Sequence, residues 1–235
     1  MMRLDKLISN STVFTRSQTK KIIRKGNITV NGIVIKKAAF KVSKSDQIHY
    51  LGIEIHLPKL RYIMMHKPKN VVCSTADAKH ETVFDLLFIN KRDSLHIAGR
   101  LDRDTTGLIL ITDDGQWSHR ITSPKYKQPK VYRVSLTEAI TKEAIQQLRT
   151  GIQLKNEKKP TLATKVEQLE DKIILLTLYE GKYHQVKRML AAVGYFVCEL
   201  HRQQIGKIVL DNDLQPGQWR ELSQSEINFS TVPIY

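Results

Sequence analysis

Cysteine is scarce in this sequence. Its 235 residues include only Cys73 and Cys198, which lie far apart and form no CxxC pair. The chain therefore encodes neither a disulfide framework nor a zinc knuckle, and we expect it to work in a reducing compartment. The histidines His119, His184 and His201 do not show the spacing of metal ligands, so we expect no metal site.

Long apolar runs are also missing. The longest, Ile173 to Leu178, is interrupted by Thr177 and is far too short to span a bilayer. The first ten residues lack the apolar core of a signal peptide. With 41% hydrophobic and 26% charged residues, the composition excludes collagen-like, low-complexity and wholly disordered proteins. These features predict a globular cytoplasmic protein with no membrane partner, and we expect a monomer.

Acidic side chains are in deficit. The chain has 38 Lys and Arg against 23 Asp and Glu, a net charge of +15, which favours a polyanionic partner. Residues 1–61 alone hold 13 cations and 3 acids, so a quarter of the chain carries two thirds of the excess. This change in composition predicts a domain over residues 1–57, a linker over 58–61 and a larger domain over 62–235.

The amino-terminal domain contains a strongly basic segment, 16–25, which the spacing predicts to be a helix. Thr15 can cap its start and Gly26 suits its end. The segment has no acid and five cations, which repel one another unless a phosphate backbone relieves them. A solvated helix face is the alternative interpretation. The cations are Arg16, Lys20 and Arg24, which share one face, with Lys21 and Lys25 beside it.

A tight hairpin is predicted next, with strands over 27–30 and 33–35 joined by Asn31 and Gly32. The stretches RLDKLI and RKGNITVNG, followed by AxxV and DxI, resemble the S4 RNA-binding domain over about residues 2–55. The resemblance implies that this domain binds structured RNA. The residues expected to contact it are Arg3, Lys6, Arg16, Lys20, Lys21, Arg24 and Lys25.

The larger domain mixes strands with few helices, without a strict βαβ rhythm. This pattern predicts an α+β fold around a mixed, mostly antiparallel sheet. The predicted strands cover 62–66, 108–112, 131–136, 163–169 and 172–179, and the predicted helices cover 141–149 and 183–193.

The most distinctive segment is AGRLDRDTTGLILITDDG, residues 98–115, in which a charged loop runs into an apolar strand. Asp102 and Asp104 lie two residues apart, and Gly107 allows a backbone geometry that other residues resist. From the residues alone, catalysis and a structural Asx-turn are equally supported. A glycosidase acid pair is a weaker interpretation, because neighbouring acids on one strand face would stand side by side rather than flank a sugar.

GRLDxDTTGL resembles the central motif of the pseudouridine synthases of small- and large-subunit ribosomal RNA. Two further stretches match that family in order, Lys130-Val131-Tyr132 and EGKYHQVKRM at 180–189. The resemblance implies that Asp102 acts on a flipped uridine, that Tyr132 stacks on the base and that Lys187 keeps Asp102 ionised. Asp104 is expected to be structural.

The resemblance also implies a partner and a cofactor requirement. The stretch TDDGQWSHRITSP, 112–124, resembles the small-subunit members, which indicates 16S ribosomal RNA or a small-subunit assembly intermediate as substrate. Arg100, Lys130 and Arg188 are expected to add RNA contacts. Isomerisation needs no cofactor, and the lack of a P-loop or GxGxxG agrees. Two alternatives stay open: a large-subunit enzyme, and an S4-bearing ribosome-assembly protein without catalysis.

Overall fold

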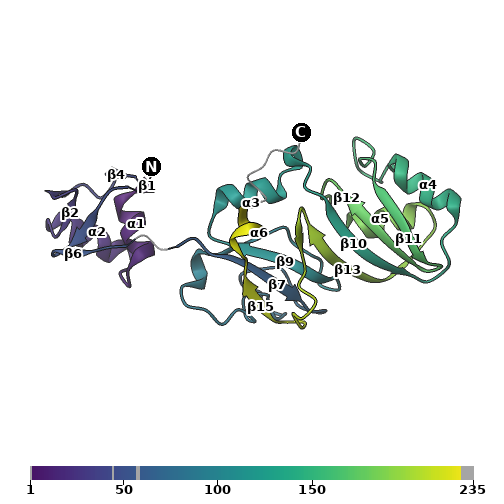
Figure 1. Cartoon of the computed structure of the whole chain (residues 1–235), viewed down its shortest axis with the longest axis horizontal. Helices are drawn as coiled ribbons and strands as arrows, with labels where there is room; N and C mark the ends of the chain where they lie inside the picture. The colour runs from purple at the N-terminus through teal and green to yellow at the C-terminus, as the bar shows by residue number, and fades with distance from the viewer. Residues whose placement is uncertain (1, 44, 57–58, 229–235) are drawn as a thin grey trace. The chain divides into compact units, whose positions relative to one another are not determined.

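The computed structural model describes residues 2–43, 45–56 and 59–228, and the chain divides into two compact units, residues 1–60 and 61–235 (Figure 1). Residue 58, in the predicted linker 58–61, lies outside the described residues. Arg61, at the end of that linker, is fixed within the larger unit. Its backbone N–H and Nε donate to Asp113, and its other guanidinium nitrogens donate to the carbonyls of Asn90 and Lys91.

The smaller unit packs two helices against short strands. Helix α2, Arg16–Arg24, begins where predicted, and Thr15 caps it by accepting a bond from the Gln18 backbone N–H. The predicted hairpin is confirmed, with Asn31 and Gly32 both at positive φ. Apolar residues of both helices and the sheet, including Leu4, Ile23 and Ile48, form its core. The other elements are α1 (Leu4–Ser11), β1 (Met2–Arg3), β2 (Ile28–Val30), β3 (Ile33–Val34), β4 (Lys41–Val42), β5 (Ile48–Tyr50) and β6 (Ile53–Glu54).

The larger unit is built on a nine-stranded sheet whose main path runs β11-β12-β10-β13-β9-β7-β15. All of its pairs are antiparallel except β13 with β9, so the predicted mixed, mostly antiparallel α+β fold is confirmed. The strands are β7 (Tyr62–Lys67), β8 (His96–Ala98), β9 (Thr106–Thr112), β10 (Lys130–Leu136), β11 (Lys165–Glu170), β12 (Ile173–Leu178), β13 (Val197–Ile205), β14 (Ile208–Val209) and β15 (Trp219–Glu221).

Helices accompany this sheet at several points of the chain. They are α3 (Gly115–Thr122), α4 (Lys142–Thr150), α5 (Gln185–Ala192) and α6 (Gln224–Asn228), with 3-10 turns at Arg92–Ser94 and Pro124–Tyr126. None of the helices in the described part of the chain is long and apolar enough to cross a membrane.

Strand β9 is buried on both faces, which explains its unbroken apolar sequence. Ile109 and Ile111 pack into a core that also contains residues of α4 and α5, while Leu108 and Leu110 pack into a second core with Trp117 of α3. A strand covered on both sides places the loop that precedes it on a rigid support. That loop is the charged segment singled out in the sequence.

Candidate active site

A cavity of about 780 Å³ lies where the three sequence motifs meet in the larger unit. Its walls come from the loop before β9, the start of β10 and the turn that leads into α5. The predicted site residues that line it are Arg100, Asp102, Lys130, Tyr132 and Lys187. Segments that lie far apart in the chain, from Arg100 to Lys187, are therefore combined in one concave site, as expected of an enzyme.

Asp102 lies between two basic side chains. Its Oδ1 is 3.3 Å from His184 Nε2, and its Oδ2 is 3.5 Å from Lys187 Nζ. The carboxylate is partly exposed, so a bound molecule can reach it while both of its oxygens are held in direction. The predicted pairing of Asp102 with Lys187 is thus present.

Asp104 shares the same cation, since Lys187 Nζ also contacts its Oδ1 at 2.5 Å. Partial burial disfavours ionisation of this carboxyl, but the hydrogen bond and charge of Lys187 outweigh that effect and lower its pKa. The Asp104 side chain therefore helps to fix Lys187, and its expected structural role stays a prediction.

His184 is a site residue that the sequence reasoning missed, having considered it only as a metal ligand. It adopts a left-handed conformation with φ 47° just before α5. The helix therefore begins at Gln185, two residues later than predicted. Its ring stacks on Tyr183 with centroids 3.8 Å apart and planes at 19°. The signal available in the sequence was its place in the same motif as Lys187.

Two buried cations hold the Asp102 loop, and neither was foreseen. Lys67, at the end of β7, donates through Nζ to the carbonyls of Pro68, Arg103 and Thr105. Burial lowers the pKa of Lys67. The carbonyl oxygens take the place of water around its ammonium group.

Arg202 of β13 grips the other side of the loop. Its guanidinium donates to the carbonyls of Gly99, Arg100 and Leu108. Gly107 lies against the backbone of Arg202 with φ 106°, and a Cβ atom there would overlap the Arg202 carbonyl oxygen. The conformational freedom predicted for Gly107 is therefore required by the close approach of β9 and β13.

Tyr132 and Lys130 point to one face of β10, as the alternation of a strand predicts. Lys130 is buried in the cavity wall, and its expected contact with RNA stays a prediction. Its Nζ donates to the Gln128 carbonyl. Burial, assisted by the charge of Arg202, lowers the pKa of Lys130 to about 8.

Arg188 is also committed within the protein. Its guanidinium pairs with Glu157 at 3.0 Å and donates to the carbonyls of Lys155 and Tyr183. The expected RNA contact of Arg188 stays a prediction, beside this structural role. Arg188 braces the turn that carries Tyr183 and His184.

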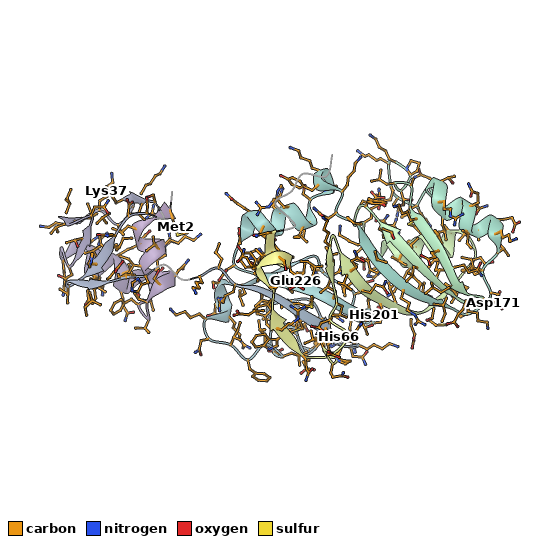
Figure 2. The ribbon with its side chains drawn as sticks, in the orientation of Figure 1. Met2, Lys37, His66, Asp171, His201 and Glu226 are labelled. Atoms are coloured by element: carbon orange, nitrogen blue, oxygen red, sulfur yellow. The ribbon has the colours of Figure 1, made fainter. Side chains whose placement is uncertain are left out.

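His201 and His66 of the sheet lie beside each other, whereas His119 of α3 packs edge-on against Tyr126. His201 Nδ1 lies 2.9 Å from Thr106 Oγ1, and its ring packs edge-on against His66 (Figure 2). Among the described residues, no group of three His, Cys, Asp or Glu side chains is placed to hold a metal ion. Cys73 is buried, where its sulfur accepts a bond from the Leu101 backbone N–H.

The described Lys and Arg residues of the smaller unit are exposed, whereas its Asp5 is buried. Asp5, a buried acid of α1, accepts two bonds from Arg3 and lies 3.6 Å from Arg16. Arg3 and Arg16 are therefore partly neutralised by an acid that the local sequence of α2 does not contain. Among the cations of this unit that were expected to contact RNA, those without such a contact to Asp5 are Lys6, Lys20, Lys21, Arg24 and Lys25.

Comparison with known proteins agrees with both units. Residues 61–192 match the family model described as RNA pseudouridylate synthase, and residues 2–48 match the S4 domain. The chain is 50% identical over 229 residues to ribosomal small subunit pseudouridine synthase A of Vibrio parahaemolyticus, covering 97% of this chain and 98% of that protein. It is 46% identical to the protein of the same name from Escherichia coli K12, covering 96% and 98%.

A solved structure of a pseudouridylate synthase matches 98% of this chain and all of its own, with 43% identity and a TM-score of 0.71. The similarity thus extends over both units and includes the segments that form the cavity. The chain belongs to the RNA pseudouridylate synthase family, carries an S4 domain and is an RNA pseudouridine synthase.

Proposed function

We propose that this synthase converts one uridine of 16S ribosomal RNA to pseudouridine, using Asp102 and no cofactor. The observation that carries the proposal is the single cavity in which Asp102, Tyr132 and Lys187 meet. The names of the similar small-subunit enzymes support the choice of RNA.

The reaction balances without a donor or an oxidant. The bond from the ribose C1′ to N1 breaks, a bond from C1′ to C5 forms, the C5 proton leaves and N1 gains a proton. A carboxylate close to the ribose and base can assist these steps by nucleophilic addition or by taking a proton. Lys187 and His184 aim Asp102 toward the cavity, and Tyr132 provides a ring on which the uracil can stack.

Base flipping follows from the position of the carboxylate. Asp102 lies inside a cavity, where a base stacked within a helix does not reach it. Stacking on an aromatic ring contributes about 1–3 kcal/mol and accepts any base. Selection of one uridine therefore requires RNA shape, for which the exposed cations of the S4 unit are suited.

The proposed setting is the cytoplasm, with the chain acting as a monomer on 16S RNA or on a small-subunit assembly intermediate. The buried Asp5 contacts Arg3 and Arg16, which leaves five neighbouring cations of the S4 unit for phosphates. RNA docking and catalysis are thereby assigned to different units of the chain.

The test is a carbodiimide map of pseudouridine in 16S and 23S RNA after incubation with wild type or Asp102→Asn. We expect one new site, in 16S RNA, with wild type only, because the amide neither ionises nor adds as a nucleophile. Naked RNA and partially assembled small subunits are both used as substrates. A site only in 23S RNA, or the same site with Asp102→Asn, would reject the proposal, and equal RNA binding and thermal melting of the two proteins exclude misfolding.

A further inference from the structure

Tyr183 presents an aromatic ring to solvent at the edge of the active-site cavity. The residue is 76% exposed, although its neighbours in the turn are engaged with other parts of the protein. Phe88 and Phe196 are similarly exposed, but neither lines the cavity. Within the described part of the chain, Tyr183 is thus the strongly exposed aromatic residue at the site.

The turn that carries Tyr183 is fixed by hydrogen bonds. Arg188 donates to the Tyr183 carbonyl at 3.1 Å. The Lys182 backbone N–H donates to Gln185 Oε1 at 2.8 Å, and Lys182 Nζ pairs with Glu157 at 3.1 Å. Because its backbone is held, the ring loses less conformational entropy on binding a partner than a ring on a free loop would.

One face of the ring is already used. The imidazole of His184 stacks against it at 3.8 Å, and the same imidazole contacts Asp102 at 3.3 Å. The high exposure of Tyr183 leaves the opposite face open for a second planar group. A group placed there extends a stack that begins beside the reactive carboxylate.

The charges around the ring favour a neutral planar partner over a phosphate. Lys182, which precedes Tyr183 in the turn, and Arg188 of α5 both pair with Glu157. Lys187 of the same helix pairs with Asp102 and Asp104. Hydrogen bonding to Arg188 and Lys182 holds the pKa of the Glu157 carboxyl below its usual range, which favours its ionised form. The turn therefore offers an aromatic surface among internally compensated charges.

We propose that Tyr183 is a stacking subsite for an unpaired nucleobase adjacent to the target uridine. This inference rests on the proposed function and deepens it, because it adds a second base-binding position outside the cavity. Flipping one nucleotide exposes the faces of its neighbours, and a fixed ring at the cavity edge can cover one of them. Such a subsite detects an unstacked neighbour rather than the identity of its base.

The test uses the full chain and a 16S RNA fragment centred on the mapped uridine, with 2-aminopurine placed on either side of it. The variants are Tyr183→Leu, Tyr183→Phe and the matched control Phe196→Leu. With Tyr183→Leu we expect KM to rise about 5- to 150-fold, the equivalent of ~1–3 kcal/mol, with a smaller change in kcat. Tyr183→Phe and Phe196→Leu should have the KM and kcat of wild type. With wild type bound, stacking on Tyr183 should quench the fluorescence of 2-aminopurine at one flanking position. Among these variants, only Tyr183→Leu should lose this quenching.

An abasic nucleotide at that flanking position separates stacking from a structural role. If Tyr183 stacks on the missing base, the abasic RNA weakens wild type to the level of Tyr183→Leu and has no further effect on that variant. A fall in kcat of Tyr183→Leu that persists on abasic RNA would show that the ring only orients His184, and would overturn the subsite. An unchanged KM while wild type forms pseudouridine would reject the subsite alone, whereas no product with wild type would reject the proposed function as well.

Discussion

Lys130 is a buried amine in the wall of the active-site cavity, and its titration should be visible in the stability of the protein. Its pKa is lowered to about 8 by burial and by the nearby charge of Arg202. Between pH 8 and its ordinary value of 10.5, the unfolded chain binds a proton at this residue that the folded chain does not. The free energy of unfolding therefore rises with pH across that window.

This prediction is tested by comparing wild type with Lys130→Met in urea at several pH values from 7 to 10. The difference between the two free energies of unfolding should be constant below pH 8. Above pH 8, the free energy of unfolding of wild type should rise relative to that of Lys130→Met by up to about 1.4 kcal/mol per pH unit. Other titrating groups cancel in the difference. A difference that does not vary with pH would mean that the amine is hydrated in the folded state.

At the scale of elements, the parallel contact between β9 and β13 lies at Thr106 and Gly107, where the Asp102 loop enters β9. Gly107 makes this contact possible, because a side chain there meets the Arg202 backbone. We expect Gly107→Ala to destabilise the fold by about 2–4 kcal/mol, through positive φ and overlap with a backbone carbonyl. Urea unfolding measures the change.

Gly115 supplies the control for that substitution. It is the first residue of α3, has no positive φ and has no atom near the position of a Cβ. Gly115→Ala should leave the stability unchanged or raise it by up to about 1 kcal/mol, as for alanine in a helix. Similar losses for both variants would show that the β9–β13 contact has no special steric demand.

The sequence pattern predicted strands that are rich in apolar residues. It did not predict a strand that also buries polar side chains. Strand β13, Val197–Ile205, was missed because its sequence, VCELHRQQI, buries Arg202 and half-buries His201. Helix α3 was missed because Asp114 looks like a turn residue, whereas its carboxylate caps the helix through the N–H groups of Gln116 and Trp117. Local propensity carries no information about such tertiary partners.

The site was predictable to the extent that its residues belong to motifs. Asp102, Tyr132 and Lys187 come from three different motifs and line one cavity, while their catalytic roles stay predictions. Lys67 and Arg202, which hold the loop, lie in β7 and β13, and both of these strands pair with β9, which is distant from them in sequence. Both side chains donate to backbone carbonyls. Because every residue has a backbone carbonyl, no sequence pattern marks these acceptors.

For the whole molecule, the division of charge between the two units predicts how salt affects RNA binding. Removing three S4 cations with Lys20→Gln, Arg24→Gln and Lys25→Gln should reduce the slope of log K against log salt by about two to three. Arg16→Gln should reduce it by less than one, because Asp5 already offsets that charge. Filter binding over a range of salt concentrations measures the slopes.

The matched control removes three exposed cations from the larger unit, Lys142, Lys158 and Lys165, none of which lines the cavity. This variant has the same net charge as the S4 triple variant. We expect its slope to remain near that of wild type. Equal slopes for the two triple variants would mean that RNA responds to total charge rather than to the S4 face.

The cations that hold the Asp102 loop come from β7 and β13, the two strands that flank β9 in the sheet. The shape of the loop is consequently a property of the assembled sheet and not of the ten residues that form the motif. Transplanting GRLDRDTTGL onto another protein would transfer the Asp102 carboxylate without the contacts that orient its loop. A design that borrows this chemistry needs all three strands and both buried cations, so the smallest portable unit is the centre of the sheet itself.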